Sequence, residues 1–170
     1  MKNPIPARLL CSLILGTALL SGCSTVVKQS YEGDPASSNL KVASYSGSTI
    51  VYGSIDPEGD NRRLVSDDYA RLGTSKVSSD HLLKFDELQS EANDVGGDIV
   101  LVSARSPGTR QYLKPLILND AGTPHTLAPY SHESTTGPAG PDYIGAEQMG
   151  TTNGQSYDYV ITFWRKAPKS

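Results

Sequence analysis

A helical pattern directly before an apolar strand pattern constrains the fold more than any other feature of the chain. Apolar residues at i, i+3 and i+4 spacing predict an amphipathic helix over residues 79–95. Its buried stripe consists of Leu82, Phe85, Leu88, Ala92 and Val95. Ser79 or Asp80 suits the N-cap, and Gly96 suits a left-handed C-cap. The apolar run DIVLVSA at 98–104 then predicts a central strand that is covered on both faces.

Three further segments have strand patterns. IVYGSI at 50–55 predicts a first strand, and YARLGTSKV at 69–77 predicts a second. YDYVITFWRK at 157–166 predicts a closing strand with both faces at least half buried. A strand, a helix and a buried strand within about 35 residues match a right-handed βαβ crossover. We therefore expect one α+β (or small α/β) domain over 50–166, with a sheet of about four strands and one main helix.

The segments between these elements are rich in turn-forming residues. DPEGDN at 56–61 predicts an acidic turn between the first two strands. About a quarter of residues 105–156 are Gly or Pro, which predicts a low-complexity excursion before the closing strand. Within it, residues 112–118 favour an edge strand, because Pro115 cannot donate to a ladder. Residues 23–49 show no sustained period and predict a flexible tether with a reach of roughly 25–31 Å.

The N-terminus has the pattern of a secretory signal peptide over residues 1–22. Lys2 and Arg8 form a short basic start, and an apolar run follows from 9 to 20. A bilayer-spanning helix needs about 20 apolar residues, so this run is too short to remain as a membrane helix. We expect it to direct export and to be removed.

The sequence LSGC at 20–23 resembles the bacterial lipobox, in which cleavage between Gly22 and Cys23 makes the cysteine the first mature residue. By that resemblance, the Cys23 thiol carries a diacylglyceryl group and its amine carries a third acyl chain, such as palmitate. Each buried methylene contributes about 0.8 kcal/mol, so three chains anchor a protein stably. In Gram-negative lipoproteins an aspartate after the cysteine resembles an inner-membrane retention signal. Ser24 stands there instead, which implies transfer to the outer membrane if the host has one. Cys11 is lost with the leader, so no internal disulfide is expected.

Composition excludes some classes of partner. The chain has 15 basic and 18 acidic residues, and loss of Lys2 and Arg8 with the leader moves the net charge from −3 to about −5. A nucleic-acid binder needs a basic face to neutralise phosphates, so we expect no nucleic-acid partner. The membrane contact is expected through the N-terminal lipid, since no polybasic patch is present.

Tyrosine dominates the aromatic residues, with nine Tyr against two Phe and one Trp. Tyrosine offers a rigid amphipathic surface that suits binding interfaces. Tyr112, Tyr130 and Tyr143 lie among small polar residues in the excursion and are candidate contact residues. Tyr157 and Tyr159 fit a structural role in the closing strand better.

Metal-binding patterns are weak. His125 and His132 are close in sequence, with Glu133 beside the second, but they lie in the excursion without a defined scaffold. His81 lies at the start of the expected helix and fits a solvated polar residue. The acidic residues of 56–61 lack the full pattern of a calcium-binding loop. These acidic residues are Asp56, Glu58 and Asp60. We expect no metal and no cofactor.

Catalytic patterns are weak as well. The chain has no G-x-S-x-G elbow. Ser38 and Lys41 match S-x-x-K by letters, but they fall in the expected tether, where nothing would lower the pKa of the lysine. Gly96 and Gly97 end a helix and do not begin one, so they do not form a phosphate loop. We expect no catalytic residues.

Three motifs together resemble a family of small bacterial lipoproteins of uncharacterised function. They are Y-x-x-L-G-x-S at 69–75, E-A-x-x-x-G-G-D-I-V-L-V-S at 91–103 and Y-D-Y-x-x-T-F-W-R-K at 157–166. That family pairs a G-A-D-x-V-L-V-S strand with a closing Y-D-Y-x-A-T-F-W strand around a variable stretch rich in Gly, Ser, Thr and Tyr. This chain departs from it at Gly97 and Ile161. The resemblance implies the lipid anchor and the fold, and it supplies no catalytic residue.

These features lead us to expect a lipid-anchored protein of the cell envelope, bound to the outer membrane. We expect a non-enzymatic binding or structural module whose partner is another envelope protein. The alternative is an inhibitor or immunity-type lipoprotein that blocks a toxic or host enzyme in the periplasm or at the surface. An enzyme is the third class, although no nucleophile and base stand out as a pair.

Overall fold

A computed structural model describes residues 25–38, 47–130, 148–151 and 154–167. Within these ranges the protein is α+β, with a mainly antiparallel six-stranded sheet, two longer helices and a small two-stranded sheet. The α+β class expected from the sequence is confirmed. The main sheet contains β1 (Tyr31–Gly33), β2 (Ile50–Ser54), β3 (Tyr69–Ser79), β4 (Ile99–Arg105), β5 (Tyr112–Leu113) and β8 (Tyr157–Lys166). It therefore has two strands more than the four expected.

The last strand of the chain lies inside the sheet. The strand order is β1-β3-β8-β4-β2, and β5 pairs with the end of β4. β8 is antiparallel to both of its neighbours, whereas β2 and β4 are parallel. β3 and β4 consequently run in the same direction with β8 between them. The expected crossover thus joins two parallel strands that are not neighbours.

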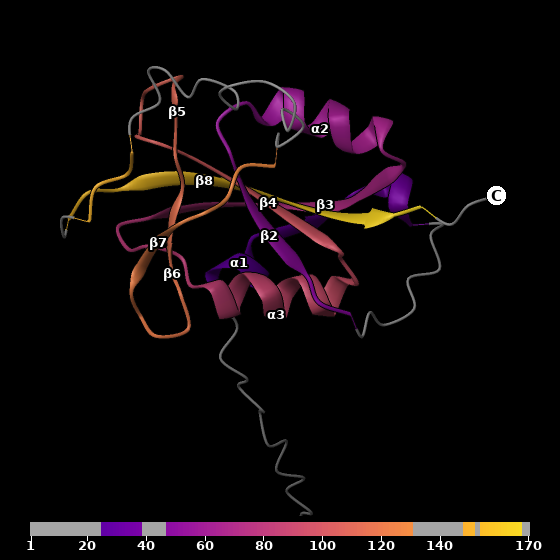
Figure 1. Ribbon diagram of the computed structural model, residues 1–170, viewed down its shortest axis with the longest axis horizontal. Coiled ribbons are helices and arrows are strands. Elements are labelled where there is room, and N and C mark those ends of the chain that lie inside the picture. The colour runs from indigo at the N-terminus through magenta and orange to yellow at the C-terminus, as the bar shows by residue number, and fades with distance from the viewer. Residues whose placement is uncertain (1–24, 39–46, 131–147, 152–153, 168–170) are drawn as a thin grey trace, which may run out of the picture.

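The two longer helices, α2 (Pro57–Ser66) and α3 (Phe85–Val95), cover opposite faces of the sheet (Figure 1). Alternation along β4 and β8 supplies a core to each face, as the sequence predicts. The larger core, beneath α3, includes Val100, Val102, Tyr159, Ile161 and Phe163. The smaller core, beneath α2, consists of Leu64, Ile99, Leu101 and Trp164.

Helix α3 begins six residues later than expected. Ser79 still belongs to β3, where it pairs with Tyr157. Its Oγ accepts a hydrogen bond from the His81 N–H at 3.0 Å, so it forms a local turn and caps no helix. Lys84 occupies the N-cap without a side-chain hydrogen bond. The C-terminus is as expected, since Gly96 has φ of 76° in the left-handed region.

The acidic stretch 56–61, expected as a turn, is the start of α2. Asp56 is the N-cap, and its Oδ1 accepts a hydrogen bond from the Gly59 N–H at 3.0 Å. Pro57 follows in the first turn, where its missing N–H costs nothing. Glu58 and Asp60 lie at the positive end of the helix dipole. Asp, Pro and Gly favour turns and helix starts alike, so the expectation of a turn was wrong.

The expected tether is wrong for residues 25–38, which pack on the domain. They form α1 (Val26–Gln29), β1 and a 3-10 helix, η1 (Pro35–Ser37). Val27 is fully buried against the core beneath α3. Its carbonyl accepts a hydrogen bond from Ser75 Oγ at 2.9 Å. Gly22, Cys23 and residues 39–46 lie outside the described residues.

The motif L-G-x-S of β3 receives this N-terminal segment. The Leu72 carbonyl accepts a hydrogen bond from the Tyr31 hydroxyl at 3.0 Å. A Cβ on Gly73 would lie 2.5 Å from the ring of Tyr31, so only glycine fits beneath that ring. Tyr31 in turn packs edge-on against Phe163, with ring centroids 5.6 Å apart. The motif residues therefore dock residues 25–38 on the sheet.

Much of the expected excursion also packs on the domain. β6 (Leu116–Leu118) and β7 (Pro124–Thr126) form an antiparallel hairpin. Asn119 closes its turn, because its Oδ1 accepts hydrogen bonds from the N–H groups of Ala121 and Thr123. The buried residues of this region are Leu113, Pro115, Leu116, Ile117, Leu127 and Met149. The low-complexity expectation is thus wrong for 112–130, while 131–147 lie outside the described residues.

Candidate binding site

A hollow of about 680 Å³ opens on the α2 face of the sheet, between η1, α2 and the start of β3. We call it the Trp164 hollow. It is lined by Asp34, Asn61, Arg62, Val65, Tyr69, Arg71 and Trp164, among others. Residues from η1, α2, β3 and the C-terminal strand β8 meet there, so the hollow forms only when distant parts of the chain have come together.

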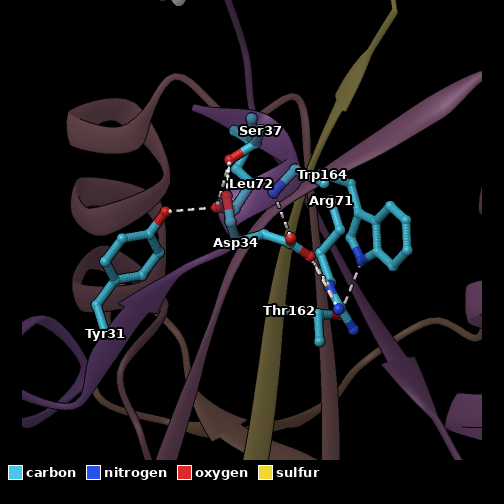
Figure 2. A network of polar contacts seen from close by, with 8 residues as sticks. Tyr31, Asp34, Ser37, Arg71, Leu72, Thr162 and Trp164 are labelled. Atoms are coloured by element: carbon cyan, nitrogen blue, oxygen red, sulfur yellow. Dashed lines mark hydrogen bonds and ion pairs between the residues drawn. The ribbon is translucent and has the colours of Figure 1, made fainter. Parts of the chain in front are cut away.

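Trp164 gives the hollow a rigid apolar floor. It is 2% exposed and packs in the smaller core with Leu64 and Leu101. Its Nε1–H donates a hydrogen bond to Thr162 Oγ1 at 2.8 Å, which satisfies the indole (Figure 2). The protein itself therefore fixes the orientation of the ring.

An ion pair between Asp34 and Arg71 forms one wall. The Arg71 Nε and Nη2 atoms both lie 2.8 Å from Asp34 Oδ2 (Figure 2). Asp34 Oδ1 accepts a hydrogen bond from the Ala36 N–H at 3.0 Å. That backbone hydrogen bond, followed by the Arg71 guanidinium, lowers the pKa of Asp34 below its ordinary value. The Arg71 side chain remains 45% exposed, so it is still accessible from solvent.

The Leu72 carbonyl fixes η1 beside the hollow. It accepts hydrogen bonds from the Asp34 N–H at 2.8 Å and from Ser37 Oγ at 3.1 Å, in addition to the Tyr31 hydroxyl (Figure 2). Ser37 Oγ also donates to the Asp34 carbonyl at 2.7 Å. The polar wall is consequently attached directly to the central sheet through β3.

A second hollow of about 850 Å³ adjoins the first, with Ser66 and Tyr69 lining both. Tyr52 and Tyr130 meet edge to face in it, with centroids 5.4 Å apart. The Tyr130 hydroxyl donates to Asp67 Oδ2 at 3.0 Å. Burial, and then this carboxylate, raise the pKa of Tyr130. Aromatic rings thus line a continuous surface from Trp164 to the β2 edge.

The tyrosines singled out from the sequence lie in different parts of the structure. Tyr130 belongs to this surface, whereas Tyr112 lies in β5, away from it, and Tyr143 lies outside the described residues. Tyr157 and Tyr159 are buried beneath α3, as expected for structural residues. Of the two candidate contact tyrosines in the described residues, Tyr130 is at the site and Tyr112 is not.

The candidate metal ligands that the structure describes do not converge. Asp56 caps α2, while Asp60 is 2% exposed and accepts hydrogen bonds from Ser54 Oγ and Arg63 Nη1. Burial raises the pKa of Asp60. His81 is exposed, and His125 lies on β7. In the ranges that the structure describes, no group of three or more His, Cys, Asp or Glu residues could hold a metal ion.

The remaining candidates lie at the margin of the described chain. The Ser38 hydroxyl donates a hydrogen bond to the Pro35 carbonyl at the end of η1. Lys41, His132 and Glu133 lie outside the described residues.

No helix in the described part of the chain is long and apolar enough to cross a bilayer.

Asp34 and Arg71 were not identified from the sequence. They are 37 residues apart, so no local pattern connects them. Asp34 followed by Pro35 is nevertheless a helix-start signal, and it does begin η1. That signal could have shown that the segment is structured, but not that it faces Arg71.

Comparisons with known proteins add no relative. No family model matches this chain, and no curated protein or solved structure matches it either.

Proposed function

We propose that this protein is a lipid-anchored binding module of the bacterial cell envelope. Cys23 attaches it to the outer membrane, and the Trp164 hollow binds an envelope protein partner. The hollow is the observation that carries the binding role. The LSGC sequence after a short apolar run supports the anchor.

The residues of the hollow suit protein recognition. Trp, Tyr and Arg are enriched at the centres of protein interfaces and dominate their binding energy. Here Trp164 supplies the floor, and Tyr69 and Arg71 supply the walls. Val65, 63% exposed, adds an apolar side chain at the rim. A projecting apolar side chain of the partner fits over Trp164.

The rim also favours a particular charge. Arg62 is exposed, and Asp34 offsets only part of the charge of the two arginines. A carboxylate beside the apolar side chain of the partner would therefore be attracted. Charge-assisted hydrogen bonds from arginine are among the stronger contacts in such sites.

Site-specific photo-crosslinking tests this role. A photoreactive amino acid at Arg62 is expected to trap one discrete partner in intact cells. The same group at Asp120, in the turn of the β6–β7 hairpin, serves as the matched control. Once identified, the partner is expected to bind Arg71→Ala roughly tenfold or more weakly, as for an interface hot spot. Crosslinks that are equal at both positions, or unchanged affinity of Arg71→Ala, would remove the hollow as the binding site.

A further inference from the structure

The chain between the lipid site and the folded domain is very short. Only Ser24 separates Cys23 from Thr25, the first described residue. A chain spans at most about 3.6 Å per residue when it is fully extended. The Cα of Cys23 therefore lies within about 7 Å of the Cα of Thr25, whatever path the chain takes.

Thr25 is firmly attached to the domain. Its Oγ1 caps α1 by accepting a hydrogen bond from the Lys28 N–H at 3.2 Å. Lys28 Nζ is paired with Asp94 Oδ2 at 2.5 Å, which joins α1 to α3. Val27, between Thr25 and Lys28 in the sequence, is fully buried. Thr25 consequently moves with the whole domain.

Helix α1, directly after Thr25, and the Trp164 hollow lie on opposite sides of the sheet. Val27 packs in the core beneath α3, and Trp164 packs in the core beneath α2. Figure 1 shows α1 beside α3 on one face and α2 on the other. Val26, 49% exposed, projects an apolar side chain next to the anchor.

We propose that the lipidated protein lies with its α1–α3 face against the bilayer head groups and presents the α2 face, with the Trp164 hollow, away from the membrane. The proposal rests on the acylation of Cys23 in the proposed function. The short chain between Cys23 and Thr25 produces this placement. Attraction between the protein and anionic head groups does not contribute to it. Lys28 is already paired, and α3 contributes the acidic Asp86 and Glu87 to the same side.

Energy transfer to the bilayer tests the placement. The mature chain is coupled through Cys23, its only cysteine, to a maleimide lipid in phosphatidylcholine–phosphatidylglycerol vesicles that carry an acceptor lipid. A fluorescent amino acid replaces either Ser90 on α3 or Val65 on α2, both exposed. Transfer is expected to be several-fold stronger from position 90.

A spacer variant is the matched control. Insertion of about 25 Gly and Ser residues between Ser24 and Thr25 adds a reach of roughly 25–30 Å and should abolish the contrast. Equal transfer from both positions without the spacer, or stronger transfer from position 65, would overturn the placement. The lipid in this experiment is coupled chemically, so the result does not depend on acylation in cells. Absence of acylation in cells would contradict the proposed anchor, but it would not change the orientation measured on vesicles.

Discussion

The Ser75 hydroxyl on β3 donates a hydrogen bond to the Val27 carbonyl at 2.9 Å and joins two segments 48 residues apart. Ser75 is fully buried, as is Val27. The first described residues of the chain are therefore part of the core. In the proposed lipidated form, this contact would hold the domain close to the membrane, whereas a flexible tether would let it move far away.

Val27→Ala is expected to destabilise the domain by about 2 kcal/mol, because it opens a cavity in the core. Val26→Ala, at the neighbouring exposed position, should change stability by less than about 0.5 kcal/mol. Denaturant unfolding of the soluble chain that begins after Cys23 measures both. Equal stability of the two variants would show that α1 is not packed on the sheet.

Trp164→Ala should cost roughly 3–5 kcal/mol, a large share of the stability of a small domain. Trp164 is buried in the central strand and forms the floor of the hollow. Val65→Ala, at the exposed rim of the same hollow, is the control and should be nearly neutral. Thermal unfolding is the measurement, and a midpoint for Trp164→Ala within a degree or two of wild type would place β8 outside the core.

Asp56→Ala should destabilise the protein by about 1 kcal/mol, because the N-cap of α2 is lost. Glu58→Ala removes a charge from the same turn but no cap, so its effect should be smaller.

Calcium is expected to leave the unfolding midpoint of the wild type unchanged, since the carboxylates of Asp56 and Asp60 already accept hydrogen bonds within the fold. A calcium-dependent rise that Asp56→Ala abolishes would restore the calcium alternative.

Glu91 predicts a particular pH dependence. It is 4% exposed, and its Oε2 has no hydrogen-bond partner. Burial raises its pKa above the ordinary value of 4.5, while Lys28 acts in the opposite direction and Asp94 adds to the rise. The folded state therefore binds the proton more tightly than the unfolded state. Stability should rise as the pH falls through the folded pKa and level off below the unfolded one.

Glu91→Gln removes this contribution. The free energy of unfolding of the variant minus that of the wild type should be larger at about pH 7 than at about pH 4. The reason is that only the wild type gains stability from protonation of Glu91 as the pH falls through that interval. Unfolding at a series of pH values, with both proteins in parallel, measures the difference. A difference that is constant with pH would show that Glu91 titrates normally.

Periodic segments of this fold were predictable from sequence, and segments held by single distant contacts were not. The alternation in β8 and the unbroken apolar run of β4 identified both central strands, because a strand that is buried on two faces repeats its signal over many residues. In residues 25–38, one buried valine and one tyrosine carry the packing. Such a segment has no period to detect.

The candidate site was harder to predict than the fold. Trp164 could be placed inside the sheet from its alternation with Thr162. Its role as the floor of a hollow depends on η1 and α2, whose starts share their residue types with ordinary turns. The Asp34–Arg71 pair depends on the register between β1 and β3, which local sequence does not determine.

Acylation of Cys23 is the claim on which partner binding at the membrane and the orientation of the domain both depend. Mass spectrometry of the N-terminal peptide, from protein purified out of cell membranes, tests it most directly. The wild-type peptide should begin at Cys23 and carry the mass of a diacylglyceryl group and a further acyl chain. The Cys23→Ser variant should retain its leader and carry no lipid. An unmodified wild-type peptide, or identical processing of the two proteins, would contradict the lipid anchor.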